Sequence, residues 1–358
     1  MRIAIVAPLI EAVPPPLYGG TERVVSVLTE ELVRRGHDVT LFASGDSQTA
    51  AKLFACCPRG LRLDPEARDT VAYTMVQLGE AYGQASDFDL IHNHIDYLAF
   101  AFARLSQTPT ITTTHGRMDL AEVRRLYMIF PEQPLVSISD SQRNPLPGVN
   151  WTRTVYNGID LDHFHYEATG GDYLVFLGRI SPEKRPDRAI ELARDVGMRL
   201  IVAAKVDPAD QAYYEHAIMP LLRSSSLIEY IGEVNEQEKN KLLGGAFAYL
   251  FPIDWPEPFG LTMVEAMATG TPVVAYRAGS VPEVILDGVT GFICDSFTDM
   301  AAAIPRAGSL DRASCRAHVE QFFSAGAMAD GYEQAYQQLL AGGAGPSTYV
   351  KSTGHSEP

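Results

Sequence analysis

The sequence lacks the features of a membrane protein, a disulfide scaffold or a nucleic-acid-binding protein. No apolar stretch in its 358 residues approaches the ~18–20 residues that a membrane span needs, and the N-terminal apolar run is too short for a signal peptide. The four cysteines show no CxxC spacing and no histidine partners at zinc distances, so we expect reduced thiols in a cytoplasmic protein. The formal net charge of −15 argues against general nucleic-acid binding.

A GxGxxG turn is also missing after the first expected strand, which argues against a Rossmann dehydrogenase. What the chain does have is 46% hydrophobic residues and, at roughly 100–200 residues per domain, the length of two domains. Short apolar runs alternate with amphipathic stretches in two series, one starting at Ile3 and one near Gly170. This alternation predicts an α/β fold with two doubly wound Rossmann-like domains that face each other across a cleft.

The join between the domains is expected between the turn signal Asn157-Gly158 and the pair Gly170-Gly171. A last helical stretch could cross back to the first domain, and the Gly/Ser/Thr/Pro-rich end of the chain has a disordered composition. The expected units are one Rossmann-like domain over 1–165, a second Rossmann-like domain over 166–327, a helix over 328–341 and a disordered tail over 342–358.

The most informative motif runs from Glu257 to Glu265. It follows an apolar run that is typical of a strand, so Glu257 is expected in a strand-to-helix loop and Glu265 about one turn inside the helix. Between them, Gly260, Leu261 and Thr262 supply backbone N–H groups at a helix N-terminus, where an anion is stabilised. A carboxylate that can bind a diol, an anion site and a second carboxylate suit a sugar nucleotide.

Two cations follow the first strand of the second domain. Arg179 can bind a diphosphate bidentately, and Lys184 adds a point charge from the same loop. A lone pair of this kind is usually two solvated surface cations. Its place at the carboxyl end of a strand, in the same domain as Gly260–Thr262, favours an anion site instead.

Together with Gly19-Gly20-Thr21-Glu22 near the N-terminus, these motifs resemble those of the retaining glycosyltransferases of family 4 (glycosyl transferases group 1), which have the GT-B fold. The resemblance extends from Met1 to about Leu340. It implies a hexosyltransferase that moves a sugar from a nucleotide diphosphate sugar, which in this family is usually UDP-linked, to a hydroxyl acceptor. In such an enzyme 1–165 is the acceptor-binding domain and 166–327 the nucleotide-sugar-binding domain. It also implies a retained anomeric configuration, no metal and no cofactor.

The resemblance gives each matching residue a role. Arg179 and Lys184 hold the donor diphosphate, Glu257 orients the donor sugar and Glu265 binds the ribose. His115 lies near the donor sugar, and the ordinary pKa of histidine would permit acid–base work. The expected catalytic residues are therefore His115, Arg179, Lys184 and Glu257. The expected nucleotide-sugar-binding positions add Gly19, Gly20, Val234, Phe259, Gly260, Leu261, Thr262 and Glu265.

Three other hypotheses compete with this one. Glu257 could be a covalent nucleophile, as in a glycosidase carboxylate pair, but the resemblance makes it a sugar ligand and we expect front-face attack. A sugar-nucleotide 2-epimerase shares the architecture, yet the sequence shows no motif for the base that it needs. A non-catalytic sugar-nucleotide-binding protein is disfavoured by the intact set of charged site residues.

Some strings imitate metal sites. Asp87-Phe-Asp89 and Asp160-Leu-Asp162 are formal DxD strings, but the first leads into the amino end of a strand and the second lies in the linker. His92 and His94 follow a strand, where either could face the acceptor cleft, and we expect no metal there.

The acceptor is expected to be a small molecule, a glycan or a lipid, chosen by the loops Glu11–Tyr18 and Ala43–Ala72. The stretch Arg117–Phe130 is basic and aromatic. A half-buried surface helix explains it best, and peripheral contact with a membrane stays open.

Overall fold

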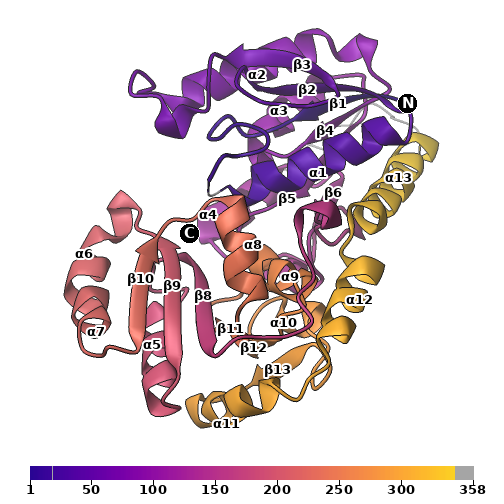
Figure 1. Ribbon diagram of the computed structural model, residues 1–358. Helices are drawn as coiled ribbons and strands as arrows, with labels where there is room; N and C mark the ends of the chain where they lie inside the picture. Colours follow the sequence, from indigo (N-terminus) through magenta and orange to yellow (C-terminus); the bar gives the residue numbers. More distant parts are fainter. Residues whose placement is uncertain (18, 343–358) are drawn as a thin grey trace, which may run out of the picture.

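The computed structural model describes residues 1–17 and 19–342, and the predicted α/β fold with two parallel sheets is confirmed (Figure 1). Among these residues, the first sheet has the strand order β3-β2-β1-β4-β5-β6-β7 and the second the order β10-β9-β8-β11-β12-β13. Every strand pair in both sheets is parallel, as β1 with β2 and β8 with β9. Apart from Gly342, the predicted disordered tail lies outside the described residues.

The first domain carries the seven-stranded sheet and the helices that connect its strands. Its strands are β1 (Arg2–Val6), β2 (Asp38–Ser44), β3 (Lys52–Cys57), β4 (Leu90–Asn93), β5 (Thr110–Thr114), β6 (Leu135–Ser137) and β7 (Trp151–Thr154). Its helices are α1 (Gly20–Arg34), α2 (Thr70–Gly83), α3 (Phe100–Leu105) and α4 (Ala121–Ile129).

The second domain carries the six-stranded sheet, and its chain ends in the last two helices. Its strands are β8 (Tyr173–Arg179), β9 (Arg199–Lys205), β10 (Ile228–Gly232), β11 (Ala248–Phe251), β12 (Val273–Tyr276) and β13 (Gly291–Cys294). The helices are α5 (Pro186–Asp195), α6 (Gln211–Tyr213), α7 (Met219–Leu222), α8 (Glu236–Gly244), α9 (Leu261–Ala268), α10 (Val281–Val284), α11 (Phe297–Ala307), α12 (Arg312–Phe322) and α13 (Ala325–Ala341).

Both faces of each sheet are covered, which explains why the strands are continuous apolar runs. In β1, Ile3 and Ile5 pack in the core under α1, whereas Ala4 and Val6 pack with Leu78 of α2 on the opposite face. This alternation follows from the two-residue period of a strand. β8 is used in the same way, with different residues in the two cores of the second domain.

The strand order reverses between β1 and β4 in the first sheet and between β8 and β11 in the second. Such switch points open a crevice at the carboxyl ends of the strands, because the loops on either side turn in opposite directions. Both switch points lie along the interface between the domains, so the fold alone predicts where a ligand binds.

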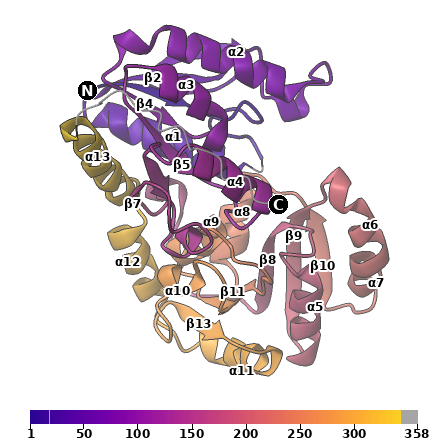
Figure 2. The same cartoon turned by 180° about the vertical axis from the view of Figure 1, so that it is seen from behind.

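Helix α13 lies on the first domain, although it follows the second domain in the chain (Figures 1 and 2). Its buried Tyr332 and Tyr336 belong to the same core as Val25 and Leu28 of α1. At its outer edge, Arg35 donates to Asp330 at 2.7 Å. The helix therefore fastens the end of the chain to the first domain.

The stretch 43–72, expected as a loop, contains the strand β3 and the start of α2. β3 pairs with β2 alone, and Lys52 and Ala55 on it are exposed, so its apolar pattern is weak. β7 has an equally weak pattern and is not predicted by the sequence, since all four of its residues are only half-buried. Between α6 and α7 the chain forms a π-helical turn at Tyr214–Ile218.

Candidate active site

A cavity of about 440 Å³ lies between the two domains, at both switch points. This volume falls in the usual range of small-molecule sites. Its walls include loops of the first domain, among them Gly19 and His115, and loops of the second domain, among them Lys184 and Glu265. The expected site residues that line it are Gly19, Gly20, His115, Lys184, Val234, Glu257, Phe259, Gly260, Leu261, Thr262 and Glu265.

Lys184 and Glu257 form an ion pair at the second switch point. Lys184 comes from the loop after β8 and Glu257 from the loop after β11, and the two loops are joined where Asp254 N–H donates to Glu183 C=O at 2.9 Å. The indole N–H of Trp255 donates to the same Glu257 carboxylate at 2.9 Å. The carboxylate is therefore oriented from two sides.

A glycine keeps the Glu257 loop in place. Gly279 has φ of +54°, and a Cβ there would lie 2.3 Å from the carbonyl oxygen of Glu257. The next residue, Ser280, donates its N–H to that carbonyl at 3.0 Å and its hydroxyl to Phe259 C=O at 2.7 Å. Only glycine allows the backbone at this position to approach so closely.

Helix α9 begins at the cavity, as the motif predicts. Its N-cap, Gly260, adopts the left-handed conformation with φ of 77°, and the amides of Leu261 and Thr262 belong to the first turn. N–H groups at these positions have no acceptor within a helix and attract anions. Helix α1 of the first domain also begins at this cavity, at Gly20, so two helix N-termini converge on it.

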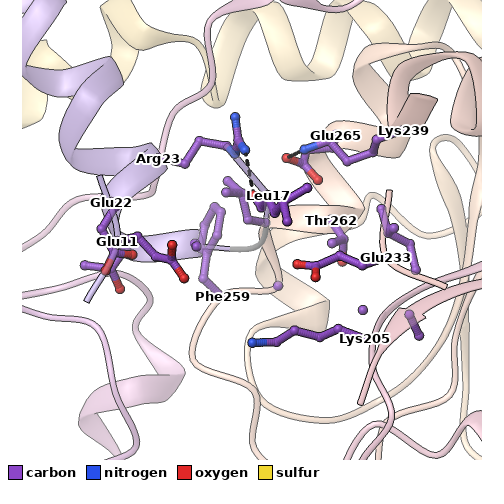
Figure 3. Close-up of a pocket in the computed structure, with 18 of the residues that line it drawn as sticks. Glu11, Leu17, Glu22, Arg23, Lys205, Glu233, Lys239, Phe259, Thr262 and Glu265 are labelled. Carbon is purple, nitrogen blue, oxygen red and sulfur yellow. Dashed lines mark hydrogen bonds and ion pairs between the residues drawn. The ribbon is translucent and has the colours of Figure 1, made fainter. Parts of the chain in front are cut away.

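Glu265 lies one turn inside α9 and is 3% exposed. Its carboxylate pairs with the buried ammonium group of Lys239, which comes from α8 (Figure 3). The two side chains line the cavity on the side of the second domain. A carboxylate held by one cation still has lone pairs for the hydroxyls of a ligand.

Arg179 is not among the residues that line this cavity. Its guanidinium lies 3.5 Å from Asp207, 3.6 Å from Asp210 and 3.9 Å from Glu183. The side chain at the end of β8 therefore points toward acidic neighbours. Its assignment to a donor diphosphate stays a prediction, whereas Lys205, from the end of β9, does line the cavity.

His115 belongs to a cluster of three histidines, in which His92 and His94 are buried and His115 is half-buried at the cavity. Its Nε2 lies 2.9 Å from Nδ1 of His94, whose ring is centred 3.9 Å from that of His92. Burial lowers the pKa of His115 to about 4 and that of His92 to about 3, and it lowers the pKa of His94 well below its ordinary value. His115 is therefore neutral at physiological pH, and the expectation of a near-neutral titration is wrong.

The cluster is connected to α13 through hydrogen bonds. Tyr336 O–H lies 2.7 Å from Nδ1 of His92, and Nε2 of His92 lies 2.8 Å from the Thr113 hydroxyl. Thr113 in turn donates to the Tyr332 hydroxyl at 3.0 Å. His92 and His94 are not among the residues that line the cavity. Neither therefore faces it, contrary to the expectation that either could face the acceptor cleft. Across residues 1–17 and 19–342, no three His, Cys, Asp or Glu side chains are grouped to hold a metal ion.

The histidine cluster predicts a loss of stability in acid. The lowered pKa values mean that these histidines stabilise the folded state above the ordinary value of 6.5, and that this contribution is lost as the pH falls from about 6.5 toward 4. The neighbouring Asp96, whose buried carboxyl has its pKa raised to about 6, offsets part of this loss.

We expect His92→Gln to flatten the pH dependence of the urea midpoint between pH 7 and 5. His216→Gln, at an exposed position, is the control. An unchanged slope in His92→Gln would refute this explanation.

Several cavity residues were not identified from the sequence: Glu11, Glu22, Arg23, Arg62, Lys205 and Lys239. For Lys239 a signal was present, because it lies four residues before the buried Leu243 and so shares its face of α8. For Arg62 none was present, since its position depends on a loop packed against Ile10.

Comparisons with known proteins identify the family of this chain. The family model described as Glycosyltransferase Family 4 matches residues 18–163, and the one described as Glycosyl transferases group 1 matches residues 160–312. The chain is a family 4 glycosyltransferase. The predicted family, GT-B fold and enzyme class are thereby confirmed.

Similar proteins extend over most of this glycosyltransferase. A glycogen synthase of Mycobacterium tuberculosis is 25% identical over 334 residues, which cover 78% of this chain and 80% of that protein. Sucrose-phosphate synthase from Thermosynechococcus elongatus has a similar structure, with a TM-score of 0.77, 18% identity and coverage of 96% and 100%. Anabaena HepE, in complex with UDP-glucose, superposes with a TM-score of 0.70, 18% identity and coverage of 95% and 100%.

The family 4 glycosyltransferase acts on nucleotide sugars. Within its described residues, none of the helices combines the length and apolarity required to cross a bilayer.

Proposed function

We propose that this glycosyltransferase transfers a hexose from a UDP-linked donor to a hydroxyl acceptor, with retention and without a metal ion. The observation that carries the proposal is the cavity that brings Lys184, Glu257 and the start of α9 together opposite His115 and the start of α1. The complex of Anabaena HepE with UDP-glucose supports the choice of nucleotide and sugar. A cytoplasmic location, the domain limits at 165 and 327, and membrane contact through α4 stay predictions.

Positive potential for the donor diphosphate comes from the protein itself. The amides at the start of α9 and the ammonium of Lys184 lie on one wall of the cavity. Preorganised donors of this kind stabilise charge as it develops, because they need no reorganisation during the reaction. In this proposal they take the place that a divalent cation has in other transferases, and Arg179 joins them if it turns from its acidic neighbours.

Glu257 and His115 face the transferred sugar in this proposal. The Glu257 carboxylate, held by Lys184 and Trp255, orients sugar hydroxyls. His115, held by His94, offers a neutral ring for hydrogen bonding. Glu265 binds the ribose hydroxyls from the far end of the α9 motif.

The proposed chemical step is a front-face displacement. The bond from the anomeric carbon to the β-phosphate oxygen breaks while the acceptor oxygen forms its bond on the same face. The departing phosphate oxygen takes the proton of the acceptor hydroxyl. Glu257 remains a sugar ligand, because its carboxylate is engaged by Lys184 and Trp255 rather than exposed for attack on carbon.

A thermal-unfolding panel of nucleotides and nucleotide sugars tests the donor. A ligand at 100 times its dissociation constant adds about 2.7 kcal/mol of stability. We expect UDP and UDP-glucose to raise the melting temperature more than ADP, GDP or their glucose conjugates. No shift with any of these nucleotides would contradict the proposed function, and a shift with ADP alone would contradict the choice of UDP.

Measurements of UDP release and of the product distinguish transfer from epimerisation. A transferase releases UDP from UDP-glucose faster when an acceptor is added. An epimerase would instead change the configuration at C2 without an acceptor, and a binding protein would do neither. Analysis of the product by NMR shows whether the anomeric configuration is retained.

A further inference from the structure

The first-domain wall of the cavity carries a pair of buried carboxyl groups that the donor does not need. Glu11 is 4% exposed and Glu22 is 5% exposed, and both line the cavity. Figure 3 shows them on the side opposite to Lys239 and Glu265. Since the donor-binding residues come mainly from the second domain, this pair is available to another ligand.

A close loop contact builds this wall. Gly60 lies against the backbone of Glu11, where a Cβ would be 2.9 Å from its carbonyl carbon. Arg62 N–H donates to Ile10 C=O at 2.9 Å. The contact brings the Arg62 guanidinium to the Glu11 carboxylate, and the two form an ion pair.

The ion pair neutralises Glu11 and leaves Glu22 as the second carboxyl. Burial, with a smaller contribution from the charge of Glu11, raises the pKa of Glu22 to about 7. At neutral pH its carboxyl group can therefore both donate and accept a hydrogen bond. Glu22 lies two residues after Gly20, so it is within one turn of the helix start that faces the donor.

The other cations of the cavity are directed elsewhere. Arg23 forms a 2.9 Å ion pair with Glu236 of the second domain. Lys184 pairs with Glu257, Lys239 with Glu265 and Lys205 with Asp207. A phosphorylated acceptor placed against Glu11 and Glu22 would therefore meet a carboxyl pair whose ion-pair partner, Arg62, is already bound to Glu11. A hydroxyl group would meet hydrogen-bond partners that suit it.

We propose that Glu11, Glu22 and Arg62 form the acceptor subsite and select a neutral, polyhydroxylated acceptor, a sugar or a cyclitol. Glu22 holds an acceptor hydroxyl near the anomeric centre and rejects acceptors that carry a phosphate at this position. This inference rests on the proposed transfer from a nucleotide sugar, and it adds the class of the acceptor.

Glu22→Gln tests the inference with UDP-glucose as donor. The acceptor probes are glucose, maltose and myo-inositol, each compared with glucose 6-phosphate and myo-inositol 3-phosphate. We expect the wild type to favour the neutral probes by at least about tenfold in kcat/KM. The assay is run at pH 8, above the raised pKa of Glu22, where the wild-type carboxylate makes a charge-assisted hydrogen bond that the Gln amide cannot make. Its loss should raise the KM of the neutral acceptor by about 10- to 100-fold in the variant.

Three measurements distinguish a wrong acceptor subsite from a variant that does not fold and from a wrong donor. In Glu22→Gln the melting temperature should change by less than a few degrees. The KM of the donor and the rate of the slow hydrolysis of UDP-glucose should each change less than twofold. Glu122→Gln, at an exposed position on α4, is the matched control and should leave every parameter unchanged.

Several outcomes would overturn the subsite. These are an acceptor KM that stays within twofold in Glu22→Gln, a preference for the phosphorylated probes, and UDP-glucose hydrolysis without transfer to any neutral probe. Wild-type protein that neither binds nor hydrolyses a nucleotide sugar would instead overturn the proposed function on which the subsite rests.

Discussion

Lys184→Ala should lower the turnover of this glycosyltransferase by about 10²–10³-fold, the usual effect of removing one preorganised donor from a site of developing charge. The ammonium lies at the second switch point, between the start of α9 and the Glu257 carboxylate. Its attraction to the leaving phosphate grows as the bond to the sugar breaks. The loss should therefore appear in kcat, measured as the initial rate at saturating donor, more than in the affinity for UDP.

The Lys184 prediction needs a control for charge and a control for structure. Lys52→Ala removes the same charge from an exposed position on β3 and should leave kcat unchanged. Glu257 loses its partner in Lys184→Ala but keeps the indole N–H of Trp255, so the melting temperature should fall only slightly. A variant that folds, binds UDP and turns over within threefold of the wild type would remove Lys184 from the reaction.

Arg179 differs from Lys184, because its sequence motif predicts a donor-binding role whereas its side chain contacts acidic residues outside the cavity. The motif pairs it with Lys184, whereas its side chain lies among Asp207, Asp210 and Glu183. The direction of a side chain at the end of a strand depends on neighbours from other loops. The sequence correctly predicts that Arg179 lies at the carboxyl end of β8, but it does not predict which way the side chain points.

Parallel α/β topology explains why much of the site can be predicted. Loops after β8 and β11 must meet at a switch point, so the order of strands and helices along the chain is enough to bring Lys184 and Glu257 together. The helix start at Gly260 is likewise visible as a local pattern. Lys239, Glu22 and Arg62 are different, because their positions at the cavity depend on packing between segments distant in sequence, such as Arg62 against the loop at Ile10.

The histidines show a second limit of sequence reasoning. A histidine after a strand is expected to titrate near neutrality, but His115 is half-buried beside His94, whose ring lies against Tyr332 of α13. α13 comes from the far end of the chain and contributes Tyr336 to the cluster. No pattern near residue 115 contains that information.

Glu265→Gln should abolish the ability of this glycosyltransferase to distinguish UDP from 2′-deoxy-UDP. In the wild type, a charged hydrogen bond to the ribose hydroxyl is worth about 1.5–3 kcal/mol, so we expect the deoxy analogue to bind about 10- to 150-fold more weakly. In Glu265→Gln both ligands should bind with similar, reduced affinity in isothermal titration calorimetry. Equal discrimination in variant and wild type would remove Glu265 from ribose recognition.

The buried partner of Glu265 makes a stability control necessary. Removing one member of a buried ion pair costs about 3–5 kcal/mol, because the other charge is left uncompensated. Lys239→Met alone and Glu265→Gln alone should therefore both lower the free energy of unfolding. The double variant Lys239→Met/Glu265→Gln removes both charges and should recover most of that loss. If it regains stability without regaining discrimination against 2′-deoxy-UDP, Glu265 recognises the ribose directly rather than only holding α8 to α9.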